Sequence, residues 1–580
     1  RSIRGLTTMV LHNRVRESSS TPGFFLFLND GNFELLRRWR LARARNGYEK
    51  QKDEFDFQES YIILQNKAGG VDPMGNSSFL NEAEKRKHKL KRWLVRPSAL
   101  AKAVRDPEAW QGWRIVRKKD SADNFLKKTF RHGDWFILDF GEEFVGRLKL
   151  KLATAPNYND APVRLRLIFA EFPLEIGERN RKYGSALAES WLQEEIVTLD
   201  DLPQTYTLPR VYAMRYLYVE VIGAPEKLLF QDIAFEAQSA VRKFIPPPET
   251  FDAEAVELDR AAQRTLRNCL QEVVLDGPKR DRRLWLGDLR LEAQVNAVTF
   301  RNFDLIERCI YLLAAFPLEN GQIPACIFDK PRPYGTKCAI SDYSFLFADL
   351  LLFHYQQTGN LALLKDMYAL AVQQFAIFRP FYRNGIAEQE LPGWNFIDWC
   401  ELDRRTASEG TYILGLRALA EIAGRLGHKA DQKNFRQEAA YLSSQLREHA
   451  FERRKGLFTS GPKGEISYAS QIWMILADVV SASEAKEILG RLEQTPEAIR
   501  PVTPYLHHHL LSAYEHAGEK DKLDCHLRAY WGEMLRKGMN VFPEVFVPEN
   551  ERLTPYGTDP RINSACHGWS CAPAYFLRKG

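Results

Sequence analysis

The chain of 580 residues is 45% apolar, 27% charged and 12% aromatic, and its 81 basic and 75 acidic residues give a net charge of +6. This composition excludes low-complexity, collagen-like and intrinsically disordered proteins, and it supplies enough apolar side chains for more than one large core. So small a net charge on a chain of this length indicates neither a nucleic acid nor an anionic membrane as a partner.

Membrane, metal and cofactor signals are missing as well. No run of about eighteen apolar residues occurs, so we expect no transmembrane helix. The eight cysteines form no CxxC pair and no zinc-ligand spacing, which favours reduced core cysteines and a cytoplasmic location. The triplet His507-His508-His509 does not indicate a metal site, because consecutive helical residues point in different directions. No motif indicates a cofactor, and none reveals the oligomeric state.

Residues 1–100 give no clear fold prediction, but they contain two basic runs. Residues 31–52 carry seven Lys or Arg against two Glu, and residues 85–96 carry seven Lys or Arg and no acidic residue. Such runs are typical either of an arm that binds a polyanion or of a solvated surface or helix face. The second interpretation is favoured, because few aromatic residues are interleaved with the charges.

Residues 101–245 are expected to form an antiparallel β-sandwich that serves as an accessory domain. Apolar and polar residues alternate with period two in three segments, 148–152, 163–167 and 217–221. This alternation is typical of strands with one buried and one solvated face. Three tyrosines fall beside core positions of one strand: Tyr212, Tyr216 and Tyr218. The domain is therefore expected to brace its neighbour, in preference to acting as a carbohydrate-binding module.

Residues 246–580 are expected to form a helical domain, which a proline-rich linker at 243–250 (KFIPPPET) separates from the strands. Apolar residues recur at helical spacing in three stripes, 258–273, 413–426 and 435–450. The last two are joined by a short polar break and predict an antiparallel helix pair. Further helices are expected around 341–357, 470–492 and 504–536. An α/α toroid would close so many hairpins and would place a site at one end, among the inter-helix loops.

The segment 275–290 (LDGPKRDRRLWLGDLR) is the most informative part of the chain. It follows a predicted helix that Pro278 helps to end, so it forms a loop at the mouth of the helical domain. Within thirteen residues it carries three carboxylates with cations and one flat aromatic between them: Asp276, Asp281, Asp288, Arg280, Arg282 and Trp285. Carboxylates accept bonds from sugar hydroxyls, and a tryptophan stacks on a pyranose. A loop of internal Arg–Asp pairs explains the same composition equally well.

This segment resembles the signature of glycoside hydrolase family 78, the inverting α-L-rhamnosidases, roughly D-x-P-x-R-E-R-x-x-W-x-G-D. The chain reads Asp276-Gly-Pro278-Lys-Arg280-Asp281-Arg282-Arg-Leu-Trp285-Leu-Gly287-Asp288. It departs from the pattern at the acid position, where the family typically has Glu and this chain has Asp281. A divergent branch of rhamnosidase-like proteins resembles this chain in carrying Asp there. Asp is one methylene shorter than Glu, so its loop has to compensate for the shorter reach.

Four more segments extend the resemblance, which covers about 100–580 and implies a β-sandwich followed by an (α/α)6 barrel. They are Ser341-Asp342-Tyr343-Ser344 at a helix start, Trp394–Trp399 as an aromatic wall, Val541-Phe542-Pro543-Glu544 as the loop of the base, and Cys566-His567-Gly568-Trp569 at the start of the last barrel helix. Ser341 or Asp342 is also a plausible N-cap. Asp398 reads either as a substrate ligand or as a helix cap.

The resemblance also implies a role for each site residue. Asp281 would be the general acid and Glu544 the general base, standing roughly 6.5–9.5 Å apart to leave room for a water. Asp276, Arg280 and Asp288 would bind sugar hydroxyls, and Trp285, Trp399 and His567 would shape the pocket. Four carboxylates near the aromatic wall are rival bases: Glu388, Glu390, Glu401 and Asp403.

Three functions remain open from the sequence. The first is an exo-acting α-L-rhamnosidase, or a close sibling, that removes a terminal deoxy sugar from an oligosaccharide or glycoside. The second is another (α/α)6 glycosidase, for instance of the glucoamylase type. The third is a non-catalytic, carbohydrate-binding relative, which the substitution at Asp281 suggests.

Overall fold

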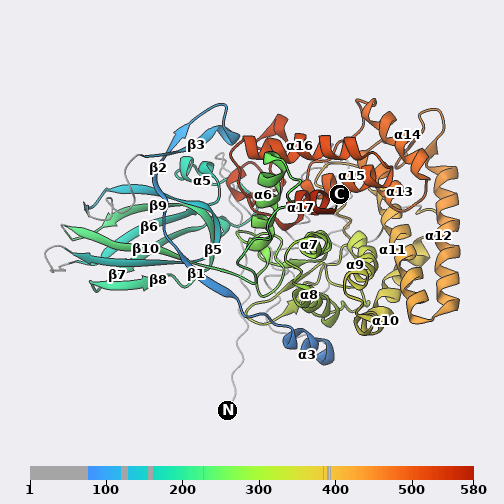
Figure 1. Ribbon diagram of the computed structural model, residues 1–580, viewed down its shortest axis with the longest axis horizontal. Helices are drawn as coiled ribbons and strands as arrows, with labels where there is room; N and C mark the ends of the chain where they lie inside the picture. Colours follow the sequence, from blue (N-terminus) through green and yellow to red (C-terminus); the bar gives the residue numbers. More distant parts are fainter. Residues whose placement is uncertain are drawn as a thin grey trace, which may run out of the picture. The chain divides into compact units, whose positions relative to one another are not determined.

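The computed structural model describes residues 76–118, 128–154, 161–225, 227–382, 385–387, 391 and 393–579. All of these belong to one compact unit, Leu64–Gly580. Within it a β-domain precedes a helical domain, and Figure 1 shows the long strands and the long helices in separate regions. The basic run at 31–52 and the rival bases Glu388 and Glu390 lie outside the described residues.

The β-domain is an antiparallel sheet whose central path runs β1-β10-β5-β9-β6-β7. Its strands are β1 (Lys91–Val95), β2 (Ala99–Arg105), β3 (Trp113–Arg117), β4 (Thr129–Phe130), β5 (Trp135–Thr154), β6 (Val163–Ala170), β7 (Glu194–Leu199), β8 (Gln204–Thr207), β9 (Tyr212–Gly223) and β10 (Leu228–Ser239). The long strand β5 pairs with β2, β8, β9 and β10 along different parts of its length. The sheet therefore surrounds one large core drawn mainly from β5, β6, β9 and β10.

The period-two segments all lie in strands, as predicted. Leu148, Leu150 and Leu152 of β5 are fully buried in the main core, while the alternating lysines face outward. Tyr212, Tyr216 and Tyr218 of β9 are buried too, between 1% and 5% exposed. Side chains buried in the core of the domain are not available as a sugar-binding surface.

The helical domain begins after the proline-rich linker. Its helices are α6 (Ala253–Cys269), α7 (Leu286–Val298), α8 (Phe303–Ala315), α9 (Ser341–Thr358), α10 (Leu361–Phe378), α11 (Arg405–Leu426), α12 (Lys429–His449), α13 (Tyr468–Leu476), α14 (Ala482–Glu493), α15 (Pro504–His516), α16 (Lys520–Arg536) and α17 (Ala572–Lys579). Helix α7 contacts α9, α9 contacts α11, α11 contacts α13, α13 contacts α15, α15 contacts α17, and α17 contacts α7. The contacts of these six helices therefore form a closed cycle, and each of the six also contacts one of α8, α10, α12, α14, α16 or α6.

Several elements differ from the sequence prediction in detail. The helix expected at 470–492 is two helices, α13 and α14, since Asp478 between them has a left-handed φ of 51°. Strand β1 and the first residues of β2 precede residue 101, where the β-domain was expected to begin. In β1 the strand signal is weak, because this edge strand leaves Leu94 53% exposed.

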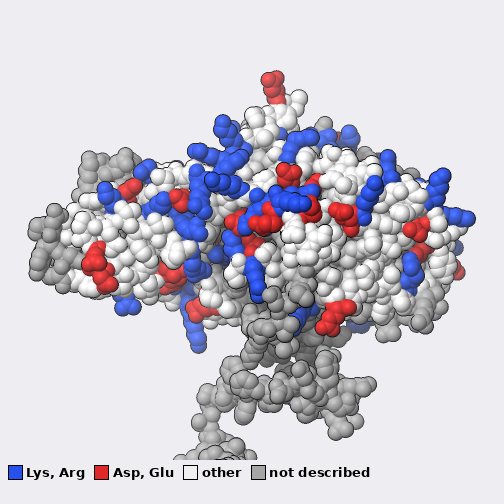
Figure 2. Space-filling model, turned by 90° about the horizontal axis from the view of Figure 1, so that it is seen from below, with Lys and Arg blue, Asp and Glu red and all other residues white. Residues whose placement is uncertain are grey.

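The second basic run lies on the surface in α3 (Ser77–Lys85) and β1, and part of it is paired. Lys85 bonds Glu82 at 2.5 Å, and Arg86 bonds Glu307 of α8 at 2.7 Å. Basic and acidic side chains are interspersed on the face shown in Figure 2. Among the described residues this run therefore has the features of a solvated surface.

One helix among the described residues is long and apolar enough by composition to cross a membrane, Leu361–Tyr382, with a mean hydropathy of 1.3. It comprises α10 and the 3-10 turn that follows. Met367, Phe375 and Phe378 of α10 are fully buried, and the helix contacts both α9 and α11. A core helix of a folded domain passes the same test of length and composition, so this helix is weak evidence for a membrane span.

Candidate active site

The loop 276–283 lies between α6 and α7 and is built around Asp276. One carboxylate oxygen of Asp276 accepts the N–H of Asp281 at 3.2 Å, and the other accepts the N–H of Arg283 at 3.0 Å. Asp276 is 4% exposed. Of the residues expected to bind sugar, this one thus primarily shapes the loop that carries Asp281.

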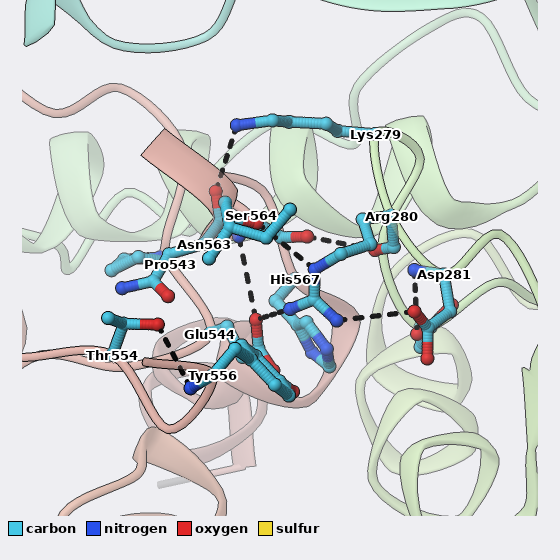
Figure 3. Close-up of polar contacts among 12 residues, drawn as sticks. Lys279, Arg280, Asp281, Pro543, Glu544, Thr554, Tyr556, Asn563, Ser564 and His567 are labelled. Atoms are coloured by element: carbon cyan, nitrogen blue, oxygen red, sulfur yellow. Dashed lines mark hydrogen bonds and ion pairs between the residues drawn. The ribbon is translucent and has the colours of Figure 1, made fainter. Parts of the chain in front are cut away.

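Arg280 connects the two carboxylates expected to catalyse (Figure 3). One terminal nitrogen of its guanidinium donates to Glu544, and the other donates to Asp281 at 3.2 Å. Its Nε donates to the carbonyl of Ile562 at 3.0 Å, and its guanidinium lies 4.2 Å from the ring centre of Tyr556. Two acids about 260 residues apart in the sequence therefore bond the same guanidinium group.

Glu544 is held by several segments at once. Its Oε1 accepts the Tyr556 hydroxyl at 2.6 Å, and its backbone N–H donates to the carbonyl of Ser564 at 3.0 Å. The indole N–H of Trp569 donates to the Glu544 carbonyl at 3.1 Å. The side chain is 2% exposed. A carboxylate that accepts from both a guanidinium and a phenol is held in one orientation.

Asp281 is the more accessible of the two, with 20% of its side chain exposed. Burial acts to raise the pKa of Asp281, but the charges of Arg283 and Arg280 outweigh it, so this pKa lies below its ordinary value. Burial, followed by the charge of Asp281, raises the pKa of Asp276 to about 7. The neighbouring pair Asp276 and Asp281 thus retains one proton almost to neutral pH.

A second layer of polar groups lies behind these residues. Asp288, near the start of α7, has an oxygen 3.4 Å from Nδ1 of His567, and the two side chains are at most 4% exposed. Neither of these two atoms has a hydrogen-bond partner within the described part of the chain. Burial and the charge of Asp276 raise the pKa of Asp288 well above its ordinary value, and burial lowers that of His567. Burial thus favours the neutral form of both side chains, and both have bonding capacity left for a ligand.

Aromatic rings border the carboxylates. Trp399 is partly exposed, lies 5.6 Å from Tyr556 and 5.2 Å from Phe396, and its indole nitrogen has no partner in the described residues. Trp285, also partly exposed, directly precedes α7. Gly287, two residues after Trp285, must lack a side chain, because a Cβ there would overlap the ring of Tyr343.

Two buried aspartates hold the aromatic wall in place. Asp342 accepts the backbone N–H groups of Phe396 at 2.9 Å and Ile397 at 3.4 Å. It is not the N-cap of α9, and neither is Ser341. That position belongs to Ile340, and α9 begins at Ser341 without a side-chain cap. Asp398 accepts from Val502 and Thr503 at the start of α15, so its oxygens serve that helix start.

The remaining candidates lie in other surroundings. Asp403 is paired with Arg405, and Glu401 is exposed. The three consecutive histidines bond three different groups, His526, Gln294 and Arg290. Sequence reasoning did not single out Tyr556 or Arg283, because Tyr556 falls in no motif and Arg283 occupies a variable position of the signature.

Comparison with known proteins accounts for this arrangement. The family model for the glycosyl hydrolase family 78 alpha-rhamnosidase N-terminal domain matches residues 97–237. That for the bacterial alpha-L-rhamnosidase 6 hairpin glycosidase domain matches residues 249–580. No curated protein sequence matches the chain.

Solved structures resemble the chain over most of its length. A rhamnosidase from Klebsiella oxytoca with rhamnose bound is 36% identical, with a TM-score of 0.84, over 87% of this chain and 99% of its own. A GH78 family rhamnosidase of Bacillus sp. GL1 is 20% identical (TM-score 0.63; 76% and 46% covered). An alpha-L-rhamnosidase of Streptomyces avermitilis complexed with L-rhamnose is 16% identical (TM-score 0.60; 85% and 44% covered). The last two support the fold alone.

Proposed function

Because the chain belongs to glycoside hydrolase family 78, the α-L-rhamnosidases, we propose that it removes a terminal α-L-rhamnose, or a closely related deoxy sugar, from a glycan or glycoside with inversion at the anomeric carbon. The Klebsiella oxytoca rhamnosidase, similar over 87% of this chain, has rhamnose bound. Its likeness to this chain supports the choice of sugar. The cleaved glycoside is the only partner that this function requires.

The observation that carries the proposal is Arg280, which bonds both Asp281 and Glu544. Inversion needs a proton donor and a water-activating base on opposite sides of the anomeric carbon. Glu544 is the base, because the Arg280 guanidinium and the Tyr556 hydroxyl hold its carboxylate in one orientation. Asp281 is the acid, because 20% of its side chain is exposed and a substrate can reach it. Arg283 and Arg280 hold the pKa of Asp281 below its ordinary value, and a bound sugar that excludes water from this carboxyl shifts its pKa back up toward the protonated form.

Other residues bind the sugar in this proposal. Asp288 and His567 offer atoms without partners among the described residues, which suits ring hydroxyls. Trp285 and Trp399 provide apolar faces, and a deoxy sugar gains from such a wall because its methyl group needs no hydrogen bond. Arg280 orients the two carboxylates, and Asp276 contributes by shaping the loop that carries Asp281.

The proposal extends to the architecture. The closed cycle of six helices, each accompanied by an outer helix, supports an (α/α)6 toroid over 246–580. The large core enclosed by the strands of 101–245, with a smaller apolar cluster beside it, supports a β-sandwich. In a toroid the loop after α6 and the segment before α17 are neighbours, which is how Asp281 and Glu544 can meet.

Hydrolysis of aryl glycosides tests the proposal. The wild type should cleave 4-nitrophenyl α-L-rhamnoside, and proton NMR should first show the β-anomer of rhamnose. Glu544→Gln should abolish most of this activity without unfolding the protein. Cleavage of the α-D-glucoside alone would favour a glucoamylase-type enzyme. A rise in melting temperature with rhamnose but no turnover of any glycoside would mean a binding protein.

A further inference from the structure

Lys279 is a fully buried lysine inside the loop that carries Asp281. Its side chain extends away from Asp281, toward the segment that contains Asn563 and Ser564 (Figure 3). Its Nζ donates to the backbone carbonyls of Arg561 at 2.7 Å and Asn563 at 3.0 Å, and to Glu175 at 2.9 Å. All three ammonium protons thus have fixed acceptors.

The acidic partners of Lys279 come from the β-domain. Glu175 belongs to α5 (Pro173–Gly177), a short helix of that domain, and Glu171 lies just after β6, 3.9 Å from Nζ. Glu171 also accepts the backbone N–H of Ala565 at 2.7 Å. Glu143 of β5 is buried nearby, and burial raises its pKa to about 8 and that of Glu171 well above its ordinary value. Of these acids, Glu175 is the one that bonds Lys279 directly, at 2.9 Å.

The segment that Lys279 holds also sets the position of Glu544. Ser564 accepts the backbone N–H of Glu544 at 3.0 Å, and its hydroxyl donates to the carbonyl of Arg280 at 2.8 Å. Ile562, in the same segment, accepts from Arg280. Residues 561–565 therefore lie between the acid-bearing loop and the base, with Lys279 fixed to their backbone.

From this geometry we propose that Lys279 is a positioning residue, which the β-domain holds through Glu175 and which sets the separation of the acid-bearing loop from Glu544. The inference rests on the proposed roles of Asp281 and Glu544. It makes the β-domain a working part of the active site as well as a brace. A buried ion pair is seldom the most stabilising way to fill such a space, which favours a role in alignment.

The test compares Lys279→Met with Arg552→Gln. Methionine retains most of the volume of lysine and removes the three bonds. Arg552 joins the helical domain to Glu178 of the β-domain at 2.8 Å, and among the described residues it forms no hydrogen bond or ion pair with Lys279 or with 561–565. A misplacement of about 1 Å can cost about 100-fold in rate, so we expect Lys279→Met to lower kcat about 100-fold with KM within about threefold of wild type. Arg552→Gln should keep kcat within about twofold.

The measurements are kcat and KM on 4-nitrophenyl α-L-rhamnoside well below each melting temperature, with the folded fraction checked by near-UV circular dichroism. Wild-type kcat in folded Lys279→Met would overturn the inference, as would an equal loss in Arg552→Gln. If Lys279→Met does not fold, Glu175→Gln tests the inference instead. We expect this variant to lose about tenfold in kcat, and an unchanged kcat would overturn the inference. An inactive wild type would instead overturn the proposed function, and this inference with it.

Discussion

The two carboxylates that share Arg280 are held in opposite ways. Asp281 is 20% exposed, and its ion pairs are with Arg280 and Arg283 of its own loop. Glu544 is 2% exposed and is fixed by Arg280, Tyr556 and the backbone around Ser564, which come from separate parts of the chain. One acid is thus set in an accessible local loop, and the other is locked by the tertiary structure.

This difference matches the division of labour in an inverting hydrolase. A proton donor has to exchange its proton with solvent in every cycle, which requires access. A base has to remain ionised and aimed at one water, which requires rigid donors around it. The predictions that follow change one side of the pair at a time.

The largest effects are expected from the carboxylates themselves. Glu544→Gln should lower kcat by about 10²–10⁴-fold on every rhamnoside, because water activation is needed whatever the leaving group. Asp281→Asn should cost a similar factor on an alkyl rhamnoside but much less on 4-nitrophenyl rhamnoside, whose leaving group needs little protonation. Steady-state kinetics on the two substrates measures this contrast.

Rhamnose-induced shifts in melting temperature provide the control for both variants, because binding should survive each change. Equal losses of Asp281→Asn on the two substrates would contradict its role as the acid. A leaving-group dependence in Glu544→Gln would reverse the two assignments.

The next largest effect on kcat is expected from the hydrogen bond between Tyr556 and Glu544. Tyr556→Phe removes the hydroxyl that donates to Glu544 at 2.6 Å and leaves the ring over Arg280 in place. A hydrogen bond to a charged group contributes about 1.5–3 kcal/mol, so kcat should fall about 10- to 100-fold with both leaving groups. Tyr441→Phe, a change at a 51% exposed tyrosine of α12, is the matched control and should leave kcat unaltered. A loss confined to alkyl rhamnosides would place Tyr556 on the acid side.

A smaller effect is expected from the charge beside Asp281. Arg283 lies 3.8 Å from Asp281 and helps to lower the pKa of that carboxyl. Arg283→Met should therefore raise the pKa, so the acid stays protonated to higher pH. The basic limb of the kcat/KM profile should move up by about one pH unit. Arg283→Lys keeps the positive charge, so the basic limb of its profile should stay at the wild-type pH. A downward shift of this limb in Arg283→Met would contradict the role of Asp281 as the acid.

The contrast between the two acids also explains how far the sequence could predict the site. One short segment contains four of the site residues: Asp276, Arg280, Asp281 and Trp285. Their spacing alone was therefore enough to predict a sugar site and to show the family resemblance. The surroundings of Glu544 depend on long-range contacts: Tyr556 follows a turn with no motif, and the acceptors of Lys279 are mostly backbone carbonyls. No local pattern in the sequence encodes such contacts.

Much of the fold could be predicted from the sequence because its signals are also local. Alternation in β5 and β9 and stripes in α11 and α12 are local signals, and they predicted strands and helices in the right regions. The break between α13 and α14 and the weakly patterned edge strand β1 were not predicted, because a single left-handed residue and an exposed edge leave little periodicity.

The smallest expected effect separates sugar binding from the geometry of Glu544. Trp399 packs against Tyr556, and its indole N–H has no partner among the described residues. Trp399→Phe keeps the apolar face but loses this donor, so KM should rise about fivefold, the value of one ordinary hydrogen bond, while kcat stays near wild type. Trp135→Phe, at a 51% exposed tryptophan of β5 in the β-domain, is the matched control and should leave KM unchanged. If kcat falls more than about tenfold instead, Trp399 acts through Tyr556 on the position of Glu544. The aromatic residues around the sugar and the general base would then be structurally coupled.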